Sequence, residues 1–206
     1  MSRERASRQD FPDRYIVNPL GPFEPPPVTA WFDTPRPLEV DLGCGRGRFL
    51  LARAARFPNV NFVGIDRLLL RLHKLDLKIV QGGIPNIRLV RGDAAETCRR
   101  LFPTSSVSAF YVLFADPWPK RKHQRRRMMS PQFVDLLHQI LVPRGLLHVA
   151  TDHQDYFTAV DTLLSGDLRF ERVPPFEPTE EEQTDFEVIF RSQQLPICRC
   201  SFSKKG

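Results

Sequence analysis

The segment Glu39-Val40-Asp41-Leu42-Gly43-Cys44-Gly45-Arg46-Gly47 decides the fold of this chain. It has the pattern of a short buried strand that ends in a turn with glycine at three alternate positions, where missing side chains let a ligand approach the backbone closely. The dinucleotide-binding pattern G-x-G-x-x-G requires its third glycine at the position of Arg48, so a nicotinamide-dependent oxidoreductase is a disfavoured alternative. The segment predicts the first strand and the ligand-binding turn of an α/β domain.

Short apolar runs alternate with helix-length amphipathic runs from this segment onward, which is typical of β-α units and a parallel sheet. The expected strands are 38–42, 61–65, 87–90, 107–114 and 146–150, and the expected helices are 47–57, 67–80, 94–102, 130–141 and 154–164. Two β-rich runs near the end, 186–191 and 197–202, predict a closing hairpin. We therefore expect an α/β fold with a doubly wound, mostly parallel sheet and an antiparallel C-terminal hairpin.

Composition limits the organisation of the chain. A length of 206 residues, 41% of them hydrophobic, is that of one ordinary domain. Residues 1–36 combine charges with a dense proline stretch, so we expect a partly mobile N-terminal arm before one domain at 37–206. No apolar run approaches the ~20 residues of a membrane-spanning helix, and the first residues lack the apolar core of a secretory signal. We expect a soluble, cytoplasmic protein without a membrane partner.

Charge and cysteine content limit the classes of binding partner and bound metal to be expected. The net charge of +6 favours a polyanionic partner. The four cysteines do not have the number or spacing of a disulfide framework. Cys198 and Cys200 form a C-x-C pair, but no second Cys/His pair completes a zinc site, so alternate positions on a strand are the simpler interpretation. We expect no metal.

Three acids stand at the ends of successive expected strands. Asp41, Asp66 and Asp93 each come at the carboxyl end of a strand, and these ends meet at one edge of a parallel sheet. An acid in the position of Asp66 can accept both ribose hydroxyls of an adenosine. Individually, each acid can instead cap a helix N-terminus. Together they predict a nucleoside ligand across this edge, and an acidic rim suits a cationic ligand better than a pyrophosphate.

The fourth of these expected strands, 107–114, leads into Ala115-Asp116-Pro117-Trp118-Pro119-Lys120. Proline fixes φ and disfavours helix in the residue before it, so Asp116 and Trp118 are expected to be held extended beside the ligand. Trp118 can stack on a planar target or pack in the core. Residues 120–127 then contain six Lys or Arg, which indicates either a phosphate-binding tract or a solvated loop.

These motifs resemble two nested families. The glycine turn resembles motif I of class I methyltransferases. Asp116-Pro-Trp-Pro-Lys120, followed by the basic residues to Arg127, by Thr151-Asp152 and by the stretch 184–187, is similar to the bacterial tRNA (guanine-N7)-methyltransferase family. Two features depart from that family. Asp185 stands where the family is usually basic, and Asp41 and Asp66 stand where it often has glutamate.

The resemblance implies a Rossmann-like enzyme that transfers a methyl group from S-adenosylmethionine to N7 of a guanine in the variable loop of tRNA. It implies Asp116 as the catalytic residue and S-adenosylmethionine as the methyl donor. The implied cofactor-binding residues are Asp41, Gly43, Gly45, Asp66, Asp93, Ala94 and Asp116. The implied target-binding residues are Lys120, Asp152, Thr184, Asp185, Phe186 and Glu187, to which the residue types add Trp118 for stacking and Arg125, Arg126 and Arg127 for the phosphate backbone.

Two other functions remain open. The same fold can methylate a different nitrogen of a nucleic acid or a protein, although those relatives favour a loop without the basic tract. An RNA-binding subunit without catalysis is the other alternative, against which the four acids at the strand ends argue. The sequence leaves a monomer and a homodimer equally open.

Overall fold

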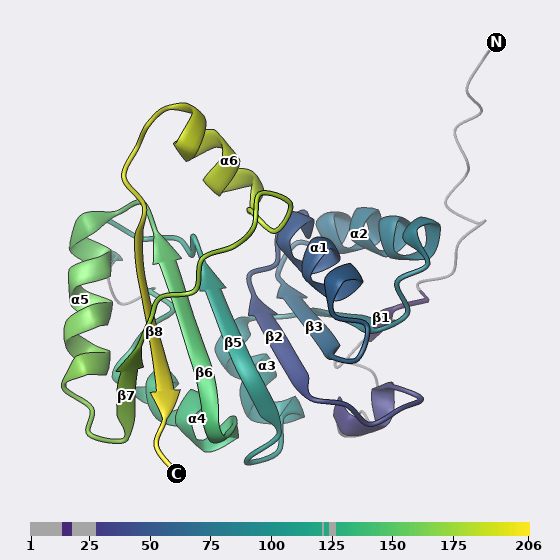
Figure 1. Cartoon of the computed structure of the whole chain (residues 1–206), viewed down its shortest axis with the longest axis horizontal. Coiled ribbons are helices and arrows are strands. Elements are labelled where there is room, and N and C mark those ends of the chain that lie inside the picture. Colours follow the sequence, from purple (N-terminus) through teal and green to yellow (C-terminus); the bar gives the residue numbers. More distant parts are fainter. Residues whose placement is uncertain (1–13, 18–27, 121, 124–126) are drawn as a thin grey trace.

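The computed structural model describes residues 14–17, 28–120, 122–123 and 127–206. Within this part, eight strands form one sheet in the order β1-β4-β3-β2-β5-β6-β8-β7 (Figure 1). The strands are β1 (Ile16–Val17), β2 (Leu38–Leu42), β3 (Asn61–Asp66), β4 (Ile87–Arg91), β5 (Val107–Leu113), β6 (Leu141–Thr151), β7 (Phe170–Val173) and β8 (Cys198–Lys204). A short 3-10 helix, η1 (Val28–Trp31), precedes β2. The α-helices are α1 (Arg48–Arg56), α2 (Leu69–Gly82), α3 (Ala94–Leu101), α4 (Pro131–Ile140), α5 (Gln154–Ser165) and α6 (Asp185–Ser192).

Strands β1 to β6 pair in parallel, and β8 pairs antiparallel with both β6 and β7. The chain order reverses between β2 and β5, which lie side by side in the middle of the sheet. In an open α/β sheet, the crevice for a ligand lies at the carboxyl ends of the strands at such a reversal. Figure 1 shows α6 above this carboxyl edge, near the ends of β5 and β6.

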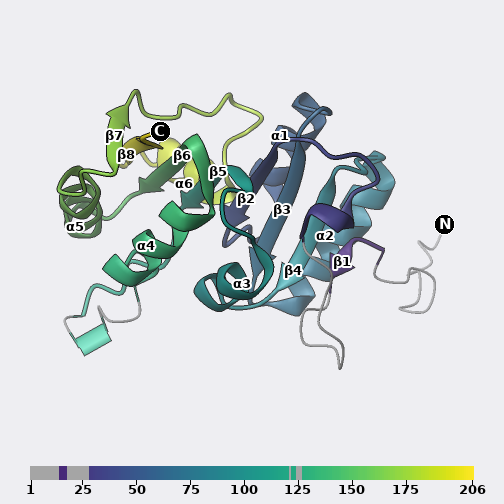
Figure 2. The same cartoon turned by 90° about the horizontal axis from the view of Figure 1, so that it is seen from below.

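Helices cover both faces of the sheet, as the doubly wound fold requires. Viewed along the sheet, α1 lies on one side and α3 and α4 lie on the other (Figure 2). Each side has its own hydrophobic core. The core beneath α1 and α2 includes Leu50, Leu72 and Ile79, and the core beneath α3, α4 and α5 includes Phe110 and Leu137. The predicted α/β architecture and the five predicted helices are therefore confirmed, with ends that differ by one or two residues.

The predicted strand at 186–191 is wrong, because this segment forms α6. Thr184 caps the helix by accepting a hydrogen bond from the backbone N–H of Glu187. Phe186, Ile189 and Phe190 then recur at helical rather than alternating spacing. The antiparallel end of the sheet exists, but it consists of β7 and β8, and β7 had not been predicted.

The described parts of residues 1–36 contact the domain. Strand β1 pairs with β4, and Val28 and Trp31 of η1 are buried in the core. Residues 1–13 and 18–27 lie outside the described part, so the division into an arm and a domain stays a prediction. Among the described helices, none combines the length and the apolar character needed to cross a membrane.

Candidate cofactor and target site

The glycine turn after β2 is bound to the end of β3. Gly43, Gly45 and Gly47 all have positive φ, at 90°, 56° and 74°, a region that favours glycine. The amides of Gly43 and Cys44 donate to the carbonyl oxygen of Ile65 at 2.8 and 3.0 Å, and the amide of Gly45 donates to the Asp66 carboxylate at 3.0 Å. The turn is therefore a fixed backbone cradle, and α1 begins directly after it.

Asp66 organises this cradle from the end of β3. Besides Gly45, its carboxylate accepts a hydrogen bond from the Leu68 amide at 2.8 Å and lies 3.6 Å from the guanidinium of Arg71. An ionised carboxylate offers about four lone-pair sites, so the two backbone donors leave acceptor capacity for ribose hydroxyls. Leu68 is 51% exposed beside this carboxylate, and its apolar side chain is a candidate contact for a nucleoside base that the sequence analysis missed.

Asp41 is the other buried acid of the cradle. It lies opposite Gly64 in the β2–β3 pairing and is only 4% exposed. Burial, and next the negative charge of Asp66, raise the pKa of Asp41 from 3.8 to about 7. A cationic ligand at this position would favour the ionised form of the carboxyl group. The pair is therefore an electrostatic site suited to a positive charge.

Asp93 caps α3. One carboxylate oxygen accepts hydrogen bonds from the amides of Ala95 and Glu96, at 3.1 and 3.3 Å, so the capping role that the sequence left open is present. The second oxygen takes no part in these two bonds. Asp93 and Ala94 lie at the end of β4, and a contact with a base ring stays a prediction for both.

The loop with Asp116 leaves the sheet at the end of β5. Phe114, the first residue after the strand, has a φ of 55° and donates its amide to Ala150 of β6 at 2.8 Å. Asp116 is exposed. Trp118 is half-buried and meets the ring of His123 edge-on with 5.8 Å between centroids. Its φ of 42° lies in the left-handed region, so the prediction that Trp118 is held extended is wrong. Trp118 is thus part of the loop surface and is absent from the buried core, while its predicted stacking on a target is untested.

The described cations of the basic tract differ in their surroundings. Lys120 and Lys122 are exposed. Arg127 is half-buried, and its Nε donates to the carbonyl oxygen of Pro117 at 2.8 Å. Its guanidinium carbon lies 5.2 Å from the centroid of the Tyr156 ring. Arg125 and Arg126, for which phosphate contacts were predicted, lie outside the described residues.

Helix α6 brings the predicted stretch 184–187 to the same edge. Glu187 is 1% exposed and forms ion pairs with Arg191, at 2.8 Å, and with Arg199 of β8. Its carboxylate therefore anchors α6 to the sheet. Asp152 is exposed just beyond the end of β6. Thr184 caps the helix, and Asp185 begins it.

An aromatic cluster on this edge was missed by the sequence analysis. Phe114 lies 5.5 Å from Phe190 and 6.4 Å from Phe186, measured between ring centroids, and the rings of Phe186 and Phe190 are stacked at 6.1 Å. Phe186 is 52% exposed. The missed signal was the helical spacing of these phenylalanines, because a strand at 186–191 would have placed them on one sheet face. The cluster places an exposed aromatic ring, that of Phe186, near the start of the Asp116 loop.

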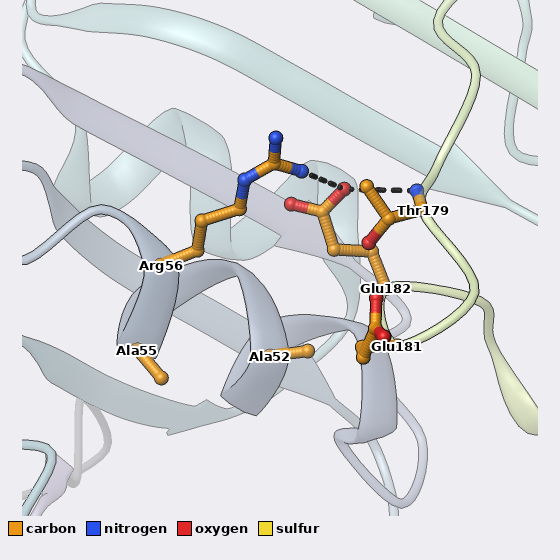
Figure 3. A pocket seen from close by; sticks show the side chains of 6 residues that line it. All are labelled: Ala52, Ala55, Arg56, Thr179, Glu181 and Glu182. Carbon is orange, nitrogen blue, oxygen red and sulfur yellow. Dashed lines mark hydrogen bonds and ion pairs between the residues drawn. The ribbon is translucent and has the colours of Figure 1, made fainter.

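A hollow lies between α1 and the segment that precedes α6 (Figure 3). Glu182 fills one side of it, where its carboxylate pairs with Arg56 at 3.3 Å and accepts the amide hydrogen of Thr179 at 3.1 Å. No predicted site residue lines this hollow. Its contacts are those of a structural junction between the segment and α1.

Comparison with known proteins gives consistent matches. A family model described as "Putative methyltransferase" matches residues 35–200. The tRNA (guanine-N(7)-)-methyltransferase of Nocardia farcinica is 43% identical over 133 residues, which are 65% of this chain and 49% of that protein. The protein of the same name from Halorhodospira halophila is 34% identical over 185 residues, which are 86% of this chain and 75% of that protein.

The matches differ in how much of each relative they cover and in sequence identity. The chain spans only 49 to 65% of the length of the first four curated relatives. The 16S rRNA methyltransferase KamB shares the fold, with a TM-score of 0.63 and 17% identity over 86% of this chain and 91% of that chain. Because the family model covers most of the chain and the Halorhodospira relative is matched over 75% of its length, this chain belongs to the tRNA (guanine-N7)-methyltransferase family.

Proposed function

We propose that this protein transfers a methyl group from S-adenosylmethionine to N7 of a guanine in the variable loop of tRNA, which produces 7-methylguanosine. One observation carries the proposal. The acidic glycine cradle after β2 and the Asp116 loop after β5 leave the sheet at adjacent strands, where Asp41 pairs with Tyr111. A cation held by the cradle is thereby next to an exposed carboxylate that can receive a target base. The names of the curated relatives agree with this activity.

The residues of the cradle fit S-adenosylmethionine. When bound, this cofactor supplies an electrophilic methyl group on a sulfonium cation. We assign the ribose hydroxyls to Asp66, the methionine end to Asp41 with the turn at Gly43 and Gly45, and the adenine to Asp93 and Ala94. Support comes from the buried acid pair, which favours a positive ligand charge, and from the backbone cradle, whose glycines leave space for close approach.

The reaction at guanine N7 mainly requires that the protein align the base with the methyl group. N7 carries an in-plane lone pair and no proton, so no general base is needed, and fixed orientation of the base supplies most of the acceleration. The purine gains positive charge as the methyl group arrives. The carboxylate of Asp116, a fixed negative charge at the end of β5, can stabilise that charge and accept hydrogen bonds from the guanine edge.

The target side combines an aromatic surface with cations. N7 is hidden in the deep, narrow major groove of folded RNA, so the guanine must be presented from a loop or drawn from its stack. Phe186, with Trp118 as the second candidate, offers a flat ring to such a base. We assign the flanking phosphates to Lys120, Lys122, Arg125 and Arg126, and the guanine edge to Asp152 and the start of α6.

The proposal has a direct test. The protein is incubated with methyl-labelled S-adenosylmethionine and unmodified tRNA, and the methylated atom is located by nucleoside analysis and borohydride–aniline cleavage. We expect label on guanine N7 in the variable loop, and no label when that guanine is replaced by adenine. Label on an exocyclic amine or on protein would reject the assigned acceptor. The absence of both S-adenosylmethionine binding and methyl transfer would favour an RNA-binding role without catalysis.

The catalytic assignment is tested separately. The variant Asp116→Ala is expected to lose at least about 10²-fold in kcat, because it removes a preorganised charge at the reacting base. Since Asp116 is exposed and outside the core, tRNA binding and thermal stability should stay close to wild type. A variant that retains full turnover would exclude Asp116 as the catalytic residue.

A further inference from the structure

Arg127 is the one described member of the basic tract whose side chain is engaged inside the protein on both sides. Its Nε donates to the carbonyl oxygen of Pro117 at 2.8 Å, and its guanidinium carbon lies over the ring of Tyr156, 5.2 Å from the centroid. Tyr156 is 1% exposed and belongs to α5 and to the core beneath it. Arg127 therefore contacts the buried core at Tyr156 and, through Pro117, the loop that contains Asp116.

The chain on the C-terminal side of Arg127 is also anchored. Met129 is buried, and Ser130 accepts a hydrogen bond from the amide of Phe133 as the N-cap of α4. By contrast, Lys120 and Lys122 are exposed. The tract thus has exposed cations at its beginning and an interior-facing cation at its end.

The loop that Arg127 contacts needs such a support. Prolines at both sides of Trp118 supply no backbone N–H for a strand ladder. Trp118 itself has a φ of 42°, a region that non-glycine residues avoid and that persists only where surrounding contacts hold it. Pro117 directly follows Asp116, so a displacement of its carbonyl group would displace the carboxylate as well.

We propose that Arg127 is a positioning residue of the methyl transfer, which braces the Asp116-Pro117-Trp118-Pro119 loop against α5, and that it is not a phosphate contact. The inference rests on the proposed function only for its catalytic consequence. Arginine suits this position because its planar guanidinium is weakly hydrated and holds its donors in a rigid fork, a geometry that the compact, strongly hydrated lysine ammonium on its flexible stem does not reproduce. The basic tract accordingly has two roles, RNA binding at Lys120 and Lys122 and loop support at Arg127.

The kinetic test compares Arg127→Ala and Arg127→Lys with the matched control Lys122→Ala. A misplacement of about 1 Å costs roughly 10²-fold in rate, so both Arg127 variants are expected to lose kcat on that scale. Their tRNA affinity and its salt dependence should stay at wild-type values. Lys122→Ala should instead weaken tRNA binding and reduce the slope of log K against log salt by up to about 0.9. Arg127 variants that reduce this slope and keep kcat would overturn the inference.

A second measurement needs neither tRNA nor turnover. The chain has two tryptophans, so in a Trp31→Phe background the fluorescence of Trp118 reports on the loop alone. We expect Arg127→Ala and Arg127→Lys to increase the quenching of Trp118 by neutral acrylamide, and Lys122→Ala to leave it unchanged. Circular dichroism identifies any variant that fails to fold. If Arg127→Ala fails to fold, Arg127→Lys, which retains the positive charge, provides the test in its place.

These readouts separate the two proposals. Increased quenching together with methylation of another atom would reject the assigned acceptor and leave the brace intact. Unchanged quenching in both Arg127 variants would reject the brace, whichever atom is methylated.

Discussion

Replacing Asp41 by asparagine is expected to stabilise the ligand-free protein, by an amount that grows with pH. Asp41 is buried beside Asp66, and its pKa is raised from 3.8 to about 7, with burial as the larger cause. Between these two pH values the unfolded chain carries an ionised Asp41, while the folded protein keeps it protonated. The folded state then binds more protons, so the free energy of unfolding falls as pH rises through this range.

The magnitude follows from the same values. One pH unit corresponds to 1.36 kcal/mol, so a carboxyl pKa raised from 3.8 to about 7 costs roughly 4 kcal/mol of stability above pH 7. The neutral amide of Asp41→Asn avoids that cost. The stability difference between variant and wild type should be about 0.5 kcal/mol at pH 4, about 1–2 kcal/mol at pH 5, and largest above pH 7. Titrating groups distant from Asp41 cancel in this difference because they are common to both proteins, whereas Asp66 interacts with Asp41 and does not cancel.

Urea unfolding at pH 4.5, 6 and 8 measures the effect. With a slope of about 2–3 kcal/mol per molar urea, 4 kcal/mol displaces the midpoint by roughly 1.5–2 M at pH 8. A difference that is independent of pH, or that shrinks as pH rises, would refute the assignment of a raised pKa to Asp41.

Cofactor binding should be coupled to the ionisation of Asp41. S-adenosylmethionine carries a sulfonium charge that favours ionised Asp41, so binding below pH 7 should release close to one proton and gain almost tenfold in affinity per pH unit. Calorimetry in buffers of different ionisation enthalpy measures the release. S-adenosylhomocysteine, whose sulfur is uncharged, is the control and should release less. Proton uptake, or pH-independent affinity between pH 5.5 and 7.5, would contradict the role of Asp41 at the cofactor.

Three other changes have defined outcomes. Glu187→Gln removes one of the two carboxylates that pair with the buried Arg199 and leaves Glu177 at 3.4 Å, so we expect a loss of about 1–3 kcal/mol in urea unfolding, and an unchanged midpoint would show that the Glu187–Arg199 pair contributes little. Gly47→Ala places a Cβ 2.3 Å from Leu75 Cδ1 at a φ of 74°, so thermal unfolding should reveal a loss of about 1–3 kcal/mol. Phe186→Ala, at a side chain that is 52% exposed, should raise the KM for tRNA about tenfold and leave stability nearly unchanged; an unaltered KM would exclude stacking there.

The sheet and its working edge could be predicted because local signals and the overall fold agree there. Strand β2 was predicted with its observed ends, since a buried apolar run meets the glycine turn at Gly43. The parallel strands β1 to β6 then have their carboxyl ends at one edge, so the positions of Asp41, Asp66 and Asp116 followed from topology without knowledge of any contact.

Helix α6 could not be predicted in the same way. Phe186 to Arg191 contains β-branched and aromatic residues that favour a strand when composition is considered alone. The cap at Thr184 and the ion pairs of Glu187 reverse that preference, and the partner Arg199 lies 12 residues away on β8. Local propensity fails where a long-range contact decides the outcome. For Arg127 the predicted phosphate contact stays untested, and its 5.2 Å approach to the Tyr156 ring is a contact between distant parts of the chain that the sequence could not predict.

The protonation of Asp41 shows why a correct residue assignment does not yet define a mechanism. The sequence places two acids at adjacent strand ends, and both would ordinarily be ionised at neutral pH. The two acids differ in their contacts. Two backbone amides and Arg71 face the carboxylate of Asp66, whereas burial and the charge of Asp66 raise the pKa of Asp41. Asp41 is therefore protonated below pH 7 in the ligand-free protein, and we expect its negative charge to form when a cation binds. We expect the proposed cradle to bind a sulfonium ion more tightly than the neutral thioether that remains after methyl transfer, because only the sulfonium carries a charge that stabilises ionised Asp41.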